Sequence, residues 1–413
     1  MKLKNLLLTL LLAAPMVVNA EESSENKVTL KPYGFVRTDF YYNSRDCVAG
    51  VNDVFNLYPM DIDLDANGED LNAYSSSGFF AFVSRLGLDI KGSLGKATAS
   101  AKIEVDFGGY SNMNTLLRIR QAYIDLDWES GNSLLIGQTW HPLFGEVAPM
   151  MVNLSTGAPY QPFSRTPQVR YEYGSQSGFK FIAAALWQLQ YLSNGPDSPD
   201  GKSIEYQANS CIPEFYAGVD LKAGNWLIGV GANVLNISPR QESTVDDLTY
   251  KVDELMTAVS GEFHLRYNDD KLYFALKSLY ASALDHTTML GGYAVTSINS
   301  VTGEQTYTPL HNSTTWLNVA YGKRWVPSIF VGYTKNLGAT KDVYTDAMYG
   351  SGLDIDQLVS GSFSLWYKIP HWSFGIEYTA QTAWYGDANE RGRVINTHDV
   401  TNHRVTSQIS FIF

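Results

Sequence analysis

The sequence contains little charge for its length, and most of that charge is negative. Aspartate, glutamate, lysine and arginine make up 17% of the 413 residues, whereas an average soluble domain is about a quarter charged. With 30 basic and 42 acidic residues, the net charge is −12 at pH 7. Because no contiguous basic stretch is available to neutralise phosphates, the composition excludes a nucleic-acid binder.

Long apolar runs are also missing, and cysteine is scarce. After the first twenty residues no run of about 18 apolar residues occurs, which excludes a transmembrane helix. Cys47 and Cys211 are the only cysteines, so disulfides cannot hold a chain of this length together. Disorder is excluded as well, because 45% of the residues are hydrophobic and 13% are aromatic.

The first twenty residues have the pattern of a secretory signal. The chain begins with two lysines, residues 6–14 are apolar, and residues 18–20 form a small-x-small cleavage site. We therefore expect residues 1–20 to be removed and residues 21–413 to form a single domain outside the cytoplasm. Removal takes away two lysines and no acid, which changes the net charge from −12 to −14.

Hydrophobicity alternates through the rest of the chain, and this period of two predicts strands rather than helices. Between residues 97 and 107 every second residue is apolar, while the alternate positions include Lys102 and Glu104. The alternating runs are about 9–14 residues long; a tilted membrane strand needs roughly 9–11 and a typical soluble strand has about 5–6. Charges on the polar face suit a water-filled lumen and would be costly in the core of a soluble sandwich.

Short and long connections alternate along the chain. The short ones are turn sequences such as Ala223-Gly224-Asn225. The expected long connections lie near 44–77, 108–115, 141–168, 192–213, 237–254, 285–313, 337–357 and 385–402. Together the connections separate sixteen strands, and aromatic residues near the strand ends match the girdles at membrane interfaces. Since only a closed barrel pairs every strand edge in a bilayer, the sequence predicts an all-β transmembrane antiparallel up-and-down β-barrel of about sixteen strands.

The end of the chain and one internal segment resemble known outer-membrane proteins. Phe413 is preceded by apolar residues at every second position, which looks like the assembly signal of Gram-negative outer-membrane barrels. Residues 117–125 (LRIRQAYID) and 136–140 (IGQTW) resemble trimeric sixteen-stranded porins, most closely the DcaP-like porins. DcaP-like porins carry an N-terminal coiled coil, and with roughly nine residues before the first strand we expect no such stalk here.

The resemblance implies a location, partners and a site. It implies the outer membrane of a Gram-negative bacterium, contact with membrane lipid and lipopolysaccharide, and assembly as a homotrimer. It also implies that arginines line a constriction and that the loop at 141–168 folds into the lumen.

The composition of residues 141–168 points the same way. Five prolines stiffen the segment and its centre around Leu143 and Met150 is apolar, while Glu146 and Arg165 are its only strong charges. Such a loop is unfavourable in water. We therefore expect it to pack against the inner wall of the barrel; a lid or a subunit contact outside the pore is the alternative.

We expect charged residues from the early strands and this loop to form the pore constriction. The candidates are Arg37, Arg85, Arg118, Arg120, Glu146 and Arg170. Most of them could pair with acids on neighbouring strands, whereas Arg118 and Arg120 have no nearby acid in their phase and are expected to be unpaired. Counting onward by twos from Arg118 and Arg120 reaches Ala122 and Ile124, which are apolar. Strict alternation would therefore place charged and apolar side chains on the same face of this strand. Either a β-bulge near Gln121 or a strand buried at a subunit contact would resolve this conflict.

Two further sites are expected in external loops. Asp63, Asp65 and Asn67 match the first half of a calcium-binding loop, although its final glutamate is missing. The alternatives are calcium in this loop and an acidic loop without a ligand, and no other cofactor is required. Cys47 and Cys211 lie in separate loops of an oxidising compartment, where we expect a disulfide, with two free thiols as the alternative.

No catalytic motif is evident. The seven histidines are scattered, and none stands in a recognisable nucleophile motif. We therefore expect no enzyme but a porin for the passive diffusion of small hydrophilic solutes, with small anions favoured by the arginines. A structural or adhesive barrel is the alternative, and an outer-membrane hydrolase is a weaker one.

Overall fold

The fold is seen in a computed structural model of the chain, which describes residues 28–50, 53–111, 114–196 and 201–413. The expected signal segment, residues 1–20, lies outside the described residues. Among the described residues, no helix is long and apolar enough to cross a membrane.

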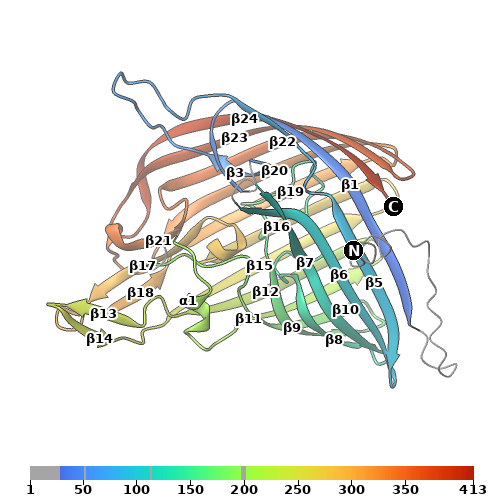
Figure 1. The fold of residues 1–413 in the computed structure, drawn as a ribbon, viewed down its shortest axis with the longest axis horizontal. Coiled ribbons are helices and arrows are strands. Elements are labelled where there is room, and N and C mark those ends of the chain that lie inside the picture. The colour runs from blue at the N-terminus through green and yellow to red at the C-terminus, as the bar shows by residue number, and fades with distance from the viewer. Residues whose placement is uncertain (1–27, 51–52, 112–113, 197–200) are drawn as a thin grey trace, which may run out of the picture.

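Seventeen strands form one antiparallel sheet that closes on itself (Figure 1). The first, β1 (Thr29–Asn43), pairs with the last, β24 (Val394–Ile412), and this pairing closes the barrel. Both β4 (Ser76–Phe80) and β5 (Arg85–Leu94) pair with β1, so they are two halves of one barrel strand. With these two counted as one, the barrel has sixteen strands, and the predicted fold class is confirmed.

The other barrel strands follow in chain order. They are β6 (Ala97–Ser111), β7 (Asn114–Trp128), β8 (Asn132–Trp140), β9 (Arg165–Gly174), β10 (Phe179–Leu186), β11 (Glu214–Ala223), β12 (Trp226–Ile237), β15 (Met256–Asn268), β16 (Leu272–Ser282), β19 (His311–Tyr321), β20 (Trp325–Gly338), β22 (Ile355–Ile369) and β23 (Trp372–Ala388).

The remaining elements belong to the long connections. They are β2 (Cys47–Gly50), β3 (Phe55–Pro59), α1 (Glu205–Ala208), β13 (Glu242–Val245), β14 (Leu248–Lys251), η1 (Asp285–Thr287), β17 (Gly291–Ile298), β18 (Gln305–Pro309), η2 (Thr345–Ala347) and β21 (Met348–Ser351). In Figure 1, β13, β14, β17, β18 and β21 gather at one end of the barrel, opposite the end where the carboxyl terminus lies.

Two connections expected to be long are short. Strands β6 and β7 are separated only by residues 112–113, and β23 and β24 only by residues 389–393. The polar sequences at 108–115 and 385–402 predict loops there. The strand ladder nevertheless continues through much of both segments, as in the pairing of Ala388 with Val394.

Strand β20 shows why the alternating pattern gives two different faces. Ile329 and Val331 point outward and are 52% and 47% exposed, as a lipid-facing surface requires. Ser328 and Phe330, which alternate with them, are buried inside the barrel. The period of two therefore separates a lipid-facing side from a lumen-facing side.

A β-bulge resolves the phase conflict in β7. Gln121 pairs with Glu104, and the register then shifts so that Arg120 is the extra residue. Before the bulge Arg118 reaches a lumen carboxylate, while beyond it Ile124 is 55% exposed on the outer face. Of the two alternatives drawn from the sequence, the bulge is therefore correct.

The interior of the barrel contains a hydrophobic core built around the loop at residues 141–164. Val147 and Tyr160 of this loop pack with Trp316 and other residues of the wall. Gly332 on β20 permits this close approach, because a Cβ atom there would lie 2.6 Å from the Tyr160 ring. The loop therefore folds inward, as expected, although it ends at residue 164 rather than 168.

The first long connection also folds inward, which the sequence did not predict. The carbonyl of Leu57 accepts a hydrogen bond of 2.7 Å from Gln381 on β23, and that of Pro59 accepts one of 2.7 Å from Tyr385. The hairpin β2–β3 is thus held against the inner wall. The hairpin therefore narrows the lumen together with the loop at 141–164.

The structure does not form the expected disulfide. Cys47 begins the buried hairpin β2–β3, and its thiol contacts the Arg45 carbonyl at 3.4 Å. Cys211 follows α1 in a separate connection and is exposed. Cys47 is therefore packed inside the barrel while Cys211 lies on the surface, and both are free thiols.

We predict that the two thiols react very differently in the folded protein. Burial raises the pKa of the Cys47 thiol, and a buried thiol is inert. Without reductant, a maleimide should label Cys211 in the folded protein and Cys47 only after unfolding, as measured by mass spectrometry of peptides. The Cys211→Ser variant, as a control, should show no labelling when folded. Labelling of neither cysteine until reductant is added would mean that the disulfide exists.

Candidate functional site

The inward loop is closed at its base and fastened across the lumen. At the base, the amide of His141 donates to the carbonyl of Ser164 at 3.0 Å. Further along, the amides of Val152 and Asn153 donate to the carboxylate of Glu377 on β23 at 2.7 and 3.3 Å. The loop therefore spans from β8 and β9 to a wall strand far away in the sequence.

Other wall residues satisfy the carbonyl groups of the same loop. Lys277 on β16 donates to the carbonyls of Leu143 and Phe144 at 2.5 and 3.0 Å. Arg37 on β1 donates to the carbonyl of Val152 at 2.9 Å. A segment without regular structure can be buried in this way because its backbone polar groups are paired.

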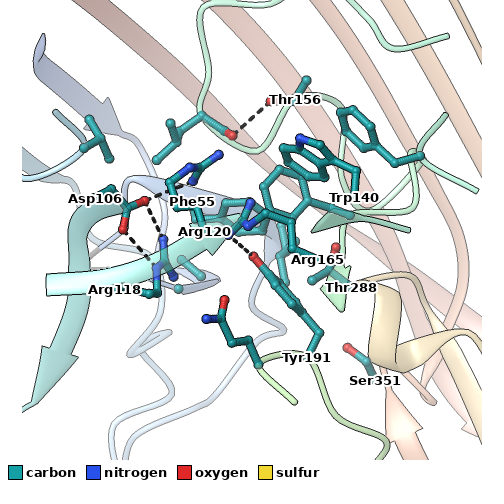
Figure 2. Close-up of a pocket in the computed structure, with 18 of the residues that line it drawn as sticks. Phe55, Asp106, Arg118, Arg120, Trp140, Thr156, Arg165, Tyr191, Thr288 and Ser351 are labelled. Atoms are coloured by element: carbon teal, nitrogen blue, oxygen red, sulfur yellow. Dashed lines mark hydrogen bonds and ion pairs between the residues drawn. The ribbon is translucent and has the colours of Figure 1, made fainter. Parts of the chain in front are cut away.

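A cavity of about 490 Å³ lies between this loop, the hairpin β2–β3 and the wall at β5–β9 (Figure 2). Its charged lining residues are Arg85, Asp106, Arg118, Arg120, Arg165 and Lys202. Aromatic side chains complete the wall: Trp140 comes from the end of β8, Phe163 from the loop and Tyr191 from the connection after β10. Arginine is thus the dominant charged residue of this cavity.

The expectation that Arg118 and Arg120 are unpaired is wrong. Asp106 accepts from Arg118 at 2.9 Å and from Arg120 at 3.0 Å (Figure 2). Glu104 accepts from Arg120 at 2.8 Å. The bulge places Arg120 beside acids of β6 that the simple alternation assigns to other positions. Two guanidinium groups and two carboxylates therefore form one neutral network.

Arg85 and Arg165 are the cavity arginines without a carboxylate partner among the described residues. Arg85 is half-buried, and its guanidinium carbon lies 5.1 Å from the centre of the Phe35 ring. Arg165 is fully buried; it donates to the Tyr191 hydroxyl at 2.8 Å and lies 4.8 Å from the Trp140 ring centre. Two of its nitrogens, Nε and Nη1, have no hydrogen-bond partner.

Sequence reasoning noted the charge of Arg165 but did not place this residue among the constriction candidates. The available signal was an arginine at the end of an apolar, proline-rich loop. Its aromatic neighbours could not be predicted, because Tyr191 comes from a different connection.

The other candidates lie elsewhere. Arg37 pairs with Asp39 at 2.9 Å and does not line this cavity. Glu146 and Arg170 line a separate cavity of about 270 Å³. There Glu146 is 3.3 Å from Lys180. Of the six candidate residues, Arg85, Arg118 and Arg120 are therefore brought together.

The acidic segment lies in the connection between β3 and β4. The Asp65 carboxylate accepts hydrogen bonds of 2.8 and 2.9 Å from the amides of Asn67 and Glu69. The amides of Glu69 and Asn67 lower the pKa of Asp65, so the side chain stays charged. Calcium binding by Asp63, Asp65 and Asn67 stays a prediction.

Comparison with known proteins gives one family match and many structural matches. Residues 8–187 match the family model of the DcaP outer membrane protein, which is slightly less than half of the chain. The outer membrane channel DcaP of Acinetobacter baumannii has the same fold, with a TM-score of 0.68 and 18% identity over 94% of this chain and 97% of that one. The chain is an outer-membrane protein with the porin fold.

Further porin structures match with lower scores. OmpT of Vibrio cholerae has a TM-score of 0.55 and 11% identity over 95% of this chain and 100% of its own. An anion-selective porin from Comamonas acidovorans has a TM-score of 0.52 and 11% identity over 94% of this chain and 100% of its own. No curated protein sequence matches the chain significantly. Together the family match and these folds support the function of an outer-membrane porin.

The stretch that matches the family model contains much of the cavity described above. The matched residues 8–187 contain the inward loop at 141–164 and all four arginines of the cavity. The strands that fasten the far end of the loop, such as β20 and β23, lie outside the matched stretch.

We predict that Glu377 holds the inward loop in place. In Glu377→Ala the buried amides of Val152 and Asn153 lose their acceptor, which costs about 1–3 kcal/mol for each unpaired group. A loss of about 2 kcal/mol corresponds to roughly thirtyfold faster hydrogen exchange in peptides that contain these amides. The matched control is Glu390→Ala in the exposed β23–β24 connection, which should exchange like the parent. Equal exchange in both variants would show that Glu377 does not hold the loop.

Proposed function

We propose that the barrel is a passive channel for small hydrophilic solutes and that its constriction favours small anions, carboxylates above all. The observation that carries this proposal is the charge of the cavity. Four arginines, including Arg85 and Arg165, surround it, while the carboxylates in contact with them are Glu104 and Asp106. These six side chains have a net charge of +2.

The place of the two uncompensated arginines supports anion preference. Arg85 is half-buried and lines the cavity, so a passing anion can approach its guanidinium group. Arg165 is buried beneath aromatic rings and acts through its field, which low-dielectric walls focus across a narrow water path. The acid of the loop itself, Glu146, faces the other cavity and is partnered by Lys180.

The negative net charge of the whole chain opposes this effect only weakly. Acidic residues such as Asp63 and Glu69 are exposed in an external loop. Exposed charges are screened over roughly 8 Å at physiological ionic strength. The charges that line the constriction therefore dominate the selectivity.

We predict that removal of one uncompensated arginine lowers anion preference. A charge about 8 Å from a passing ion contributes about 1 kcal/mol at an effective dielectric constant of about 40. This contribution favours chloride and disfavours potassium, so the permeability ratio changes by about 2 kcal/mol, or roughly thirtyfold. Arg85→Gln should reduce the chloride-to-potassium permeability ratio by this factor, as measured by the reversal potential across a planar bilayer under a salt gradient. Asp106→Asn should raise the ratio, because it removes the carboxylate that Arg118 and Arg120 share and leaves Arg118 without an acidic partner.

The matched control removes the same charge far from the cavity. Lys323 lies in the exposed turn before β20 and pairs with Asp270 at 2.9 Å. Lys323→Gln should leave the ratio unchanged. If Lys323→Gln and Arg85→Gln shift the reversal potential equally, total charge and not the cavity determines selectivity. A barrel without any conductance would favour a structural or adhesive role, and an outer-membrane hydrolase would need to be tested by activity.

We infer that the porin assembles as a homotrimer in contact with membrane lipid and lipopolysaccharide. The resemblance to trimeric porins supports this, as does the trimer form known for OmpT of Vibrio cholerae. The outward residues of β20 offer the apolar surface that lipid or a neighbouring subunit would cover. Native mass spectrometry in detergent should give three times the mass of the mature chain, and a monomer mass in several mild detergents would contradict it.

A further inference from the structure

Three buried ionisable side chains meet at the base of the inward loop. They are His141 at the start of the loop, Glu214 at the start of β11, and His286 in η1. Glu214 Oε1 lies 3.3 Å from Nε2 of His141 and 3.1 Å from Nε2 of His286. Each of the three is 2% exposed or less. One carboxylate thus joins the loop, the wall and a neighbouring connection.

The hydrogen bonds of His141 fix where its proton lies. The amide of Leu143 donates to Nδ1 of His141 at 3.1 Å, so Nδ1 carries no proton in this arrangement. Nε2 must then be protonated and donate to Glu214. This excludes the cluster as a metal centre built on His141, because metal coordination by Nε2 would require an imidazolate ring.

His286 supplies the positive charge that the buried carboxylate needs. Glu214 has no lysine or arginine partner among the described residues, and its other hydrogen bond comes from Asn233 at 2.6 Å. Burial lowers the pKa of His286, but the charge and hydrogen bonds of Glu214 outweigh it, and the net pKa is raised. The resting cluster is therefore neutral overall, with one charged and one neutral histidine.

A second proton has no place in this arrangement. At Nδ1 of His141 it would expel the Leu143 amide, which breaks a bond at the neck of the loop. We propose that the cluster of His141, Glu214 and His286 is a proton-operated latch that releases the neck of the inward loop at acid pH and so reduces the conductance of the pore.

The expected direction follows from the position of the loop. The loop already lies against the inner wall, fastened there through Glu377 and Lys277. On its other side lies the remaining water path, and we expect a released neck to move into this path and to lower the conductance. The proposal rests on the channel function proposed above.

Other charged groups surround the latch. The neighbours on the packed elements are Asp285 of η1, Lys277 of β16, Glu262 and His264 of β15, Asp220 of β11 and Glu146 of the loop. Arg170, Glu172 and Lys180 lie across the second cavity and pair with one another. Asp285 is bonded to Asn194 and Lys277 to Glu262. His264, bonded to Asp220, is the neighbouring histidine that could titrate in the same range.

The test is conductance in planar bilayers at pH 7.5 and pH 4.5, in high salt with a chelator present. Between these values an unperturbed histidine gains its positive charge, with a pKa of about 6.5. The parent should lose at least half of its mean conductance at the lower pH. His141→Gln, whose amide can still donate to Glu214 but cannot be protonated, should abolish the drop. His398→Gln at an exposed site and His264→Gln should retain it.

Several results would overturn the latch. These are a parent that conducts equally at both pH values, a drop that persists in His141→Gln, or a drop that disappears in His264→Gln while His141→Gln retains it. Conduction without pH dependence removes the latch and leaves the channel function standing, whereas no conductance at either pH overturns both.

A second measurement on the parent does not depend on how a variant folds. After correction for intrinsic rates, the Leu143 amide should lose at least tenfold of its hydrogen-exchange protection at pH 4.5. Peptides from β20 should keep theirs, and unchanged protection of Leu143 would contradict the proposal.

Discussion

A bilayer offers no water to amide and carbonyl groups, so each strand edge inside it must be paired. The pairing of β1 with β24 meets this requirement, and closure at sixteen strands produces a bore that wall side chains alone cannot fill. The space is divided between two inward segments and water. The loop at 141–164 and the hairpin β2–β3 take one part, and the arginine-lined cavity remains between them.

Backbone amide and carbonyl groups must also be paired inside the barrel, where the inward loop is buried. The inward loop has no strand partner, so side chains of the wall must satisfy its backbone groups. Glu377 accepts from its amides, Lys277 donates to its carbonyls, and Tyr273 donates to the carbonyl of Ala148 at 2.6 Å. Charged and polar side chains of the wall therefore hold the loop in place. A charged residue in the lumen-facing phase of a strand is consequently weak evidence for a selectivity filter.

The sequence predicted the features that depend on local pattern. The period of two and the alternation of connection lengths give sixteen strands, and the apolar, proline-rich composition of 141–168 gives an inward loop. The bulge was one of two alternatives, because strict alternation would place Arg118 and Ile124 on the same face of one strand. The pairing of Arg118 with Asp106 was missed because it depends on the register between two strands after the bulge.

Contacts between distant segments could not be predicted from the sequence either, because they depend on how separate strands and connections are placed in the barrel. Arg165 acquires its surroundings from Tyr191, which lies in another connection, and the hairpin β2–β3 from wall residues more than 300 positions away. Neither contact leaves a periodic trace. Alternation specifies which face a residue occupies, and it says nothing about which loop will cover that face.

The constriction and the proposed latch are physically continuous. Trp140 lines the cavity, lies 4.8 Å from the guanidinium carbon of Arg165, and stacks on Phe144 with 4.1 Å between ring centres. The next residue along the chain is His141, at the neck of the loop. One peptide unit therefore separates His141 from the ring that contacts Arg165. Coupling between two sites needs a contiguous element with two arrangements, and the bonded and released states of this neck would be those two arrangements.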